Sequence, residues 1–389
     1  MSNRHAIIIA ARRTAIGKLG GLHRHRPVEK LAAPLIAGLL ADSKLDADAV
    51  DEVILGNAIG GGGNPARLIA LSASLPASIP AITVDRQCAS GLDAIVIGAR
   101  MIETGAAEAV IAGGAESNST APWRVAKPSN LHADPPRFYS QPAFAPAQDG
   151  DPGMIEAAEA VARECGISRE RQDRFTLMSH QRAVEAAEAG IPALEVVGVG
   201  SADPELRDEG PRPSLSMALL ARMPPLLGAG GTVTAGNSCQ INDGAALTLL
   251  VSHDLYRRLG SPPGLIFTGA ASAGIEPRIL GLASLPAARK LLGKTKMTLQ
   301  DVGAIELNEA FAAQVLATID RLEIDEDRLN IFGGALAYGH PYGASGALLV
   351  SRLFTRIVRL NKGNVRAGLA MIAGAGGVGT AALFHSTHV

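Results

Sequence analysis

Two side chains suited to covalent chemistry lie just before helical stretches of the sequence. The first is Cys88 in VDRQCASGLDAI (84–95), where a strand-like run ends and a helical run begins. The positive end of a helix dipole and its unpaired N–H groups favour a thiolate at such a position. The small residues 89–91 would let a substrate approach the backbone. A buried structural cysteine is the alternative interpretation, because free cysteines are often buried.

A histidine occupies the corresponding place near the other end of the chain. His340 lies in GHPYGASGA (339–347), and a Cys–His arrangement is the usual means of activating a thiol nucleophile. We therefore predict that His340 is the base for Cys88. Asn308, in ELNEAFAAQ (306–314), follows a strand-like run and could hold a water or donate to an oxyanion. The alternatives are a structural histidine in a turn, and an asparagine in an ordinary turn or at a helix N-cap.

An internal repeat must position these residues. Three pairs of segments match in the same order and at nearly the same spacing: VDEVILGNA (50–58) with VGAIELNEA (302–310), CASG (88–91) with GASG (343–346), and AVIAGGA (109–115) with AMIAGAG (370–376). The repeat predicts two copies of one α/β module, an N-terminal half over 1–118 and a C-terminal half over 245–389. Cys88 and His340 reach one central site if the two copies face each other.

Each copy alternates short apolar runs with helical stretches, which predicts βαβ units around a mostly parallel sheet. Residues 119–244 interrupt this alternation with a Pro-rich stretch (135–146) and two amphipathic helical segments (155–166 and 169–190). We predict an inserted loop domain there, because insertions on an α/β scaffold often shape the binding site.

Composition excludes several other classes of protein. The 389 residues are 47% hydrophobic and carry a formal net charge of -1, which supports a sizeable core and gives no electrostatic reason for a nucleic-acid or membrane partner. Three widely spaced cysteines without a CxxC pair argue against disulfides and structural zinc, and favour a reducing, cytoplasmic location. No metal cluster is evident, and no stretch qualifies as a membrane span. The segment 368–384 reads as strand, turn, strand.

Taken together, the motifs resemble the thiolase family over the whole chain. The segments that carry the resemblance are RQCASG (86–91), AGGAES (112–117), GTVTAGNSCQINDGAAL (231–247), IELNEAFAAQ (305–314) and NIFGGALAYGHPYGASGA (330–347). The resemblance implies two similar βαβ-rich halves in a five-layered αβαβα fold with an inserted loop domain. It also implies a homo-oligomer, dimer or tetramer, that uses acyl-CoA and coenzyme A as substrates without a bound cofactor.

Roles follow from the resemblance residue by residue. Cys88 is similar to the nucleophile that takes the acyl group from a 3-ketoacyl-CoA, in thiolytic cleavage or in the reverse Claisen condensation. His340 resembles its activator and a member of the first oxyanion hole, and Asn308 resembles the holder of that hole's water. The alternatives are an acyl-transfer or condensing enzyme without efficient thiolysis, and a catalytically silent thiolase-like subunit.

The chain also departs from the family pattern. The closing C-x-G-G-G-x-G motif, whose cysteine is the second acid/base, reads with Ala373 at the cysteine and Ala375 at the first glycine. A methyl group cannot transfer a proton, and alanine disfavours some backbone conformations open to glycine. Cys239, in GNSC (236–239) where the family usually has serine, is our hypothesis for the substitute acid/base; a neutral replacement is the alternative. Met154, Ser238 and Ala375 are predicted to contact the substrate.

Overall fold

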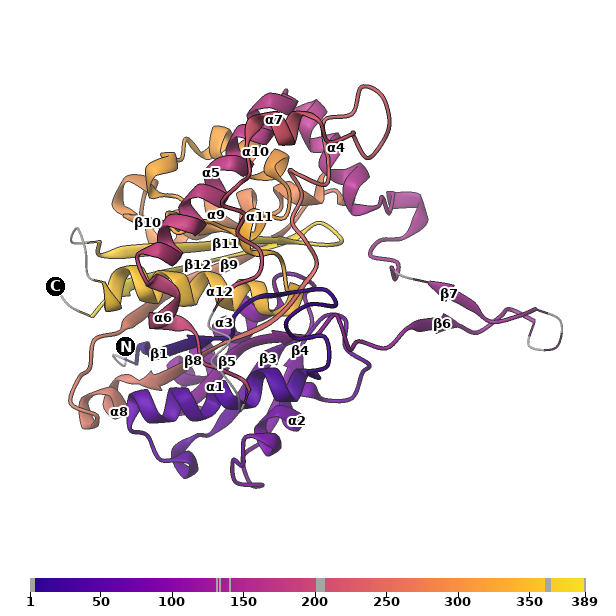
Figure 1. Cartoon of the computed structure of the whole chain (residues 1–389). Helices are drawn as coiled ribbons and strands as arrows, with labels where there is room; N and C mark the ends of the chain where they lie inside the picture. The colour runs from indigo at the N-terminus through magenta and orange to yellow at the C-terminus, as the bar shows by residue number, and fades with distance from the viewer. Residues whose placement is uncertain are drawn as a thin grey trace.

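The computed structural model describes residues 4–130, 132, 134–139, 141–200, 207–360 and 365–387. One large mixed sheet runs through it in the order β10-β11-β12-β9-β1-β8-β5-β3-β4, with β2 paired to β8 (Figure 1). Its strands are β1 (Ala6–Arg13), β2 (Gly17–Lys18), β3 (Glu52–Gly56), β4 (Ala81–Val84), β5 (Ala109–Glu116), β8 (Asn242–Ser252), β9 (Leu265–Gly274), β10 (Ala304–Leu307), β11 (Ala367–Gly374) and β12 (Val378–Ser386).

Helices and sheet halves alternate in five layers. The helices are α1 (Val28–Ser43), α2 (Pro65–Ser72), α3 (Ser90–Thr104), α4 (Met154–Glu164), α5 (Arg169–Glu188), α6 (Ile191–Glu195), α7 (Met217–Ala221), α8 (His253–Arg258), α9 (Ser284–Thr295), α10 (Ala312–Leu322), α11 (Ala335–Tyr338) and α12 (Tyr342–Phe354). One apolar cluster joins α1 and α2 to the N-terminal strands, and another joins α9 and α10 to the C-terminal strands. A third lies between the sheet halves around α3 and α12, which confirms the αβαβα arrangement.

The expectation of a mostly parallel sheet is wrong. Strand β3 is parallel to β4 and β5, and β10 to β11, but β8 runs antiparallel to both β1 and β5. Strands β11 and β12 are joined by a turn of three residues, which is too short for the crossover that parallel strands need. Gly376 and Gly377, with φ of 78° and 77°, make this turn.

The region between the halves packs mainly on the C-terminal side. Helices α4 and α5, predicted from their amphipathic pattern, pack against α10. A hairpin of β6 (Arg124–Ala126) and β7 (Arg137–Tyr139) projects from the body of the molecule (Figure 1). Strand β8 begins at Asn242, so the predicted division of the chain at 244/245 falls inside a strand whose neighbours are β1 and β5.

Small residues bring α3 and α12 into near backbone contact. A Cβ atom on Gly91 would lie 2.5 Å from the Gly343 carbonyl oxygen, and one on Gly346 would lie 2.4 Å from the Leu92 nitrogen. Only glycine fits at such positions. The two equivalent helices therefore face each other, as the repeat predicts, and their N-termini meet in the middle of the molecule.

Candidate active site

Cys88 lies in a tight turn that leads into α3. The Ser90 hydroxyl accepts the Arg86 N–H at 2.8 Å and donates to the Gln87 carbonyl at 2.6 Å, and Gln87 has a positive φ of 51°. Burial raises the pKa of the Cys88 thiol to about 12, although the N–H groups of Ala375 and of Cys88 itself act in the opposite direction. The expected thiolate is thus wrong for the free protein, because desolvation outweighs the helix N-terminus. Cys88 needs a base.

Ala375 supplies a backbone donor to this sulfur. Its backbone N–H donates a hydrogen bond to Cys88. The φ angle of Ala375 is not positive, because the positive φ angles of this turn belong to the two glycines that follow. The sequence placed the geometry of this donor in doubt because alanine replaces a glycine. The structure removes that doubt: the turn makes its unusual conformations one residue later.

His340 is positioned by contacts on two sides. Its backbone N–H donates to the Gln240 carbonyl at 2.9 Å. Its ring Nδ1 lies 2.6 Å from the hydroxyl of Ser345, in the first turns of α12. Nε2 is buried without a partner among the described residues. Burial lowers the pKa of the imidazole to about 4, so the ring is neutral at physiological pH and can accept a proton.

Asn308 follows β10 directly. Its N–H donates to the Met371 carbonyl at 3.0 Å, and its side-chain Nδ2 is buried without a partner in the described part of the chain. The alternative of a helix cap is excluded, because α10 begins at Ala312 with Phe311 at the capping position. Asn308 and Ser345 line one small cavity of about 40 Å³, which has room for ordered water. Ser345, whose hydroxyl contacts His340 Nδ1, therefore lines the same small cavity as Asn308.

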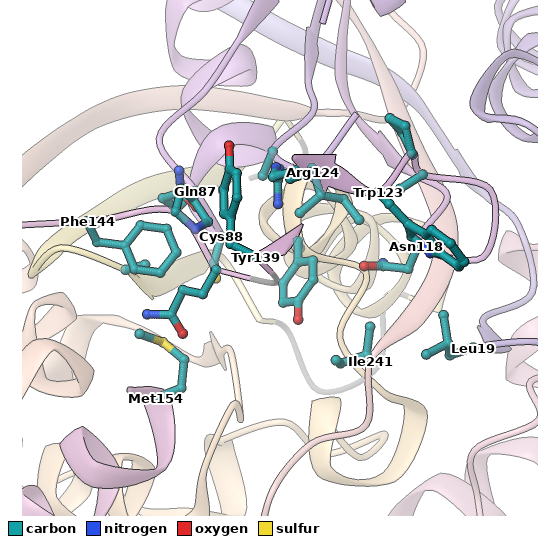
Figure 2. A pocket seen from close by; sticks show the side chains of 18 of the residues that line it. Leu19, Gln87, Cys88, Asn118, Trp123, Arg124, Tyr139, Phe144, Met154 and Ile241 are labelled. Atoms are coloured by element: carbon teal, nitrogen blue, oxygen red, sulfur yellow. The ribbon is translucent and has the colours of Figure 1, made fainter. Parts of the chain in front are cut away.

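A cavity of about 870 Å³ opens beside Cys88. Its wall is largely apolar and aromatic, with Leu19, Trp123, Phe138, Tyr139, Pro142, Phe144, Met154, Ile241 and Tyr342 among its residues, together with Ala375. In Figure 2, Cys88 lies between Phe144 and Met154 on one side and Trp123 and Leu19 on the other. The hairpin and the start of α4 thus contribute to the wall, as expected of an insertion that shapes a binding site.

Ser238 and Cys239 lie beside this cavity, but neither is among the described residues that line it. The Ser238 hydroxyl donates to the Thr234 carbonyl at 2.7 Å, and the Cys239 N–H donates to the Ala310 carbonyl at 2.9 Å. Burial raises the pKa of the Cys239 thiol, and a thiolate at Cys88 would raise it further. Their roles stay predictions.

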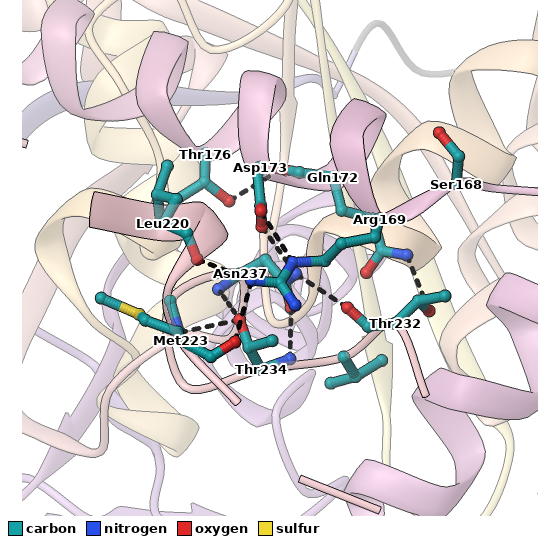
Figure 3. A network of polar contacts seen from close by, with 12 residues as sticks. Ser168, Arg169, Gln172, Asp173, Thr176, Leu220, Met223, Thr232, Thr234 and Asn237 are labelled. Carbon is teal, nitrogen blue, oxygen red and sulfur yellow. Dashed lines mark hydrogen bonds and ion pairs between the residues drawn. The ribbon is translucent and has the colours of Figure 1, made fainter. Parts of the chain in front are cut away.

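A polar network fixes the segment that carries these two residues (Figure 3). Asp173 of α5 pairs with Arg169 at 2.7 Å and accepts from Asn237 Nδ2 at 3.0 Å. Arg169 in turn donates to the Leu220 and Met223 carbonyls. The contact with Asp173 therefore holds the segment before Ser238 against α5.

Two residues of the site were missed in the sequence. Tyr342 lines the cavity, and its ring meets the His340 ring edge-on at 5.2 Å between centroids. Glu116 ends β5 with a fully buried carboxylate that accepts the N–H groups of Ala58 at 2.8 Å and Gly343 at 3.0 Å. Tyr342 lies in the segment 339–347, where an aromatic residue close to the histidine was the available signal. Glu116 lies in the segment 112–117, where an acidic residue at the end of an apolar strand was the signal.

The described residues contain neither a metal-binding cluster nor a membrane-spanning helix. No group of three His, Cys, Asp or Glu side chains is placed to hold a metal ion in this part of the chain. Across the same residues, no helix has the length and apolar character needed to cross a membrane.

Comparisons with known proteins agree with each other. The family model "Thiolase, N-terminal domain" matches residues 6–254, and "Thiolase, C-terminal domain" matches residues 263–386. A Staphylococcus epidermidis protein, VraB, provisionally named an acetyl-CoA C-acetyltransferase, is 43% identical over 380 residues, 97% of each chain. Its Staphylococcus aureus namesake is 42% identical over 382 residues, 97% of this chain and 98% of its own. The crystal structure of the Bacillus anthracis acetyl-CoA acetyltransferase superposes with a TM-score of 0.91, at 32% identity, covering 98% and 99% of the two chains.

Proposed function

The chain belongs to the thiolase family, and from that premise we propose how its cavity carries out acyl transfer between coenzyme A thioesters. The reaction is cleavage of a 3-ketoacyl-CoA by coenzyme A, or the reverse Claisen condensation, through an acyl group carried on Cys88. Splitting the reaction through a covalent intermediate divides one difficult step into two easier ones.

Cys88 and His340 would work as a pair. The Cys88 thiol is protonated in the free protein and His340 is neutral, so the proton passes from Sγ to Nε2 as the sulfur attacks the 3-keto carbon. The negative charge that develops on the keto oxygen needs donors held in place. We propose that protonated His340 and a water on Asn308 Nδ2 supply them, because both side-chain nitrogens are buried and without other partners among the described residues.

Backbone N–H groups would serve the second half-reaction. Incoming coenzyme A attacks the acyl carbon on Cys88, and the charge then falls on the former acyl oxygen beside the N–H groups of Cys88 and Ala375. Both groups already lie against the sulfur, which supports the assignment of Ala375 to substrate binding. The single observation that carries the proposal is that the Cys88 thiol lines a large apolar cavity and lies beside two backbone N–H donors.

The cavity suggests the class of substrate. The relatives of this chain are named for acetyl-CoA. The cavity volume of about 870 Å³ and the aromatic residues in the cavity wall nevertheless support acyl chains longer than acetyl. Met154, at the start of α4 and in the cavity wall, is proposed to contact the pantetheine arm. A homo-oligomer in the cytoplasm remains our expectation, and three free cysteines are consistent with a reducing compartment.

One observation favours the second candidate, acyl transfer without efficient thiolysis. Ala373, in β11 where the resemblance places a catalytic cysteine, offers no transferable proton. From the sequence, Cys239 is one candidate for the missing acid/base, but its thiol is not among the described residues that line the cavity.

The test measures two properties of the protein: the acyl adduct on Cys88 and the rate of 3-ketoacyl-CoA cleavage. We expect incubation with acyl-CoA to add one acyl mass to the protein at Cys88, and the protein to cleave acetoacetyl-CoA and a medium-chain 3-ketoacyl-CoA. Cys88→Ala should lose the adduct and on the order of 10⁴-fold or more in turnover. Cys165→Ala, which removes the free thiol at the end of α4, is the matched control and should keep both. An adduct without cleavage would favour the second candidate, and no adduct at all would contradict the proposed function.

A further inference from the structure

We propose that Tyr342 is the second acid/base of this enzyme: its phenol protonates the departing enolate and later takes the proton of coenzyme A. The inference rests on the proposed function, because it assigns a step of that reaction. It gives a proton carrier to a chain that has Ala373 where its family carries a thiol.

Geometry places this phenol in the reaction space. Tyr342 is the first residue of α12, and it lines the main cavity together with Cys88 and Ala375. Its ring packs edge-on against His340, with 5.2 Å between centroids and 76° between the planes. The backbone on both sides of Tyr342 is constrained, since Pro341 precedes it and the Gly343 N–H donates to the Glu116 carboxylate at 3.0 Å. The side chain therefore lies against His340 and lines the same cavity as Cys88.

The backbone of Tyr342 is itself unusual. Its φ is +21°, a region that bulky side chains seldom adopt. Strained backbone tends to persist where a side chain must be held in one place. Here the conformation begins α12 and links the buried His340 to the glycines that touch α3.

Electrostatics keeps the phenol protonated. Burial raises the pKa of Tyr342, and a thiolate at Cys239 or Cys88 would raise it further. An acid that must donate to an enolate has to hold its proton at neutral pH, and this one does. The interaction with both sulfurs also shows that the phenol lies within electrostatic range of the nucleophile.

The proton balance closes over one turnover. When Cys88 has attacked the keto carbon, the bond between C2 and C3 breaks and its electron pair remains on C2. The Tyr342 O–H bond then breaks as a C2–H bond forms, giving acetyl-CoA and a phenolate. The phenolate next takes the S–H proton of incoming coenzyme A, whose thiolate attacks the acyl carbon. Cys88 leaves as the thiolate and recovers its proton from His340.

Cys239 is the competing candidate for this role. Its thiol is not part of the described cavity wall, whereas Tyr342 is. The backbone of Cys239 is tied to Ala310, on the segment that leads into α10. A proton carrier must reach C2 of a substrate bound at Cys88, and the position of Tyr342 meets that requirement directly.

The experiment separates proton transfer at carbon from acyl transfer at sulfur. Three properties are measured for each protein: acetyl adduct on Cys88 after exposure to acetyl-CoA, deuterium uptake into the methyl group of acetyl-CoA in D₂O, and cleavage of acetoacetyl-CoA. Tyr342→Phe should lose about 10²–10⁴-fold in deuterium uptake and cleavage. It should keep the adduct, because a coenzyme A thiolate leaves readily without an acid and an enolate does not.

Two further variants complete the test. Tyr256→Phe removes a phenol from α8, away from the cavity, and should behave as the unmodified protein. Cys239→Ala should keep most of the deuterium uptake. The proposal is overturned if deuterium uptake by Tyr342→Phe stays within about twofold of wild type, or if Cys239→Ala loses the uptake instead. It is also overturned if Tyr342→Phe loses the acetyl adduct as well, because the substitution would then have disturbed the site as a whole and not proton transfer at carbon. An unmodified protein that forms the adduct without uptake also overturns it, whereas no adduct in any protein would reject the proposed function first.

Discussion

At the scale of single residues, one hydroxyl decides how His340 presents its second nitrogen. The Ser345 Oγ lies 2.6 Å from Nδ1 and can either accept a proton from it or donate one to it. The base needs Nδ1 protonated, so that Nε2 is free to accept. The serine hydroxyl can accept the Nδ1–H both in the neutral ring and after Nε2 has taken up a proton.

We expect Ser345→Ala to lower kcat by roughly 10-fold with little change in KM, because a free imidazole can rotate and change tautomer. Ser351→Ala, on the same helix, is the matched control: its buried hydroxyl has no partner among the described residues, so its loss should leave both constants unchanged. Steady-state rates of acetoacetyl-CoA cleavage measure the effect. A variant of Ser345 with the wild-type kcat would show that the hydroxyl does not orient the base.

The sequence showed which residues to examine but not their ionisation. Cys88 and His340 could be found because each precedes a helical stretch in an internal repeat. The pKa of the thiol depends on how much protein covers it, including the turn at Ala375 nearly three hundred positions later. Burial of this kind is a product of the fold, so reasoning from the helix N-terminus alone gave the wrong direction.

At the scale of elements, the catalytic pair depends on how closely α3 and α12 approach. We expect Gly346→Ala to lower the free energy of unfolding by roughly 2 kcal/mol, because its methyl group would lie 2.4 Å from the backbone nitrogen of Leu92. Activity should fall as well, since Cys88 and His340 lie at the starts of these helices. Urea unfolding followed by circular dichroism, with rates measured on the folded protein, tests both effects.

The control for this substitution is Gly293→Ala. It makes the same change in α9, where an added methyl group would meet nothing within 4 Å, and should gain about 0.5–1 kcal/mol from helix propensity. Equal stability changes in the two variants would contradict the close-packing argument.

Periodicity located these helices but not the direction of the strands around them. Alternating apolar and helical runs suggested parallel strands, whereas β12 returns after a three-residue turn and β8 enters beside β1 from the insertion. An apolar run has the same composition in either direction. Strand direction therefore depended on loop lengths and on the path of the insertion.

At the scale of the whole molecule, buried charges join its three parts. Arg13 of β1 pairs with Glu195 of α6 at 2.6 Å and with Asp208 at 2.7 Å, and Arg352 of α12 pairs with the same Glu195 at 3.1 Å. Glu306 of β10 lies near this group and lines the small cavity shared with Asn308 and Ser345. Its Oε1 has no hydrogen-bond partner among the described residues.

Burial raises the pKa of Glu306 to about 8, although the charges of Arg352 and Arg356 act against it. In the unfolded chain the same carboxyl has the ordinary value, so between about pH 4.5 and 8 the folded protein binds the additional proton. The contribution of Glu306 to stability is complete below that range and is lost as the pH rises through it, by roughly 5 kcal/mol.

Glutamine imitates the protonated form at every pH. We therefore expect Glu306→Gln to match the wild type in free energy of unfolding at pH 5 and to exceed it at pH 9, measured by urea titration. Glu116, His180 and His340 also titrate, but they are present in both proteins and cancel in the difference at each pH. Glu188→Gln, at the exposed end of α5, should leave the difference near zero throughout. If Glu306→Gln is less stable than the wild type at pH 9, then ionised Glu306 is paired in the folded protein and the burial argument fails.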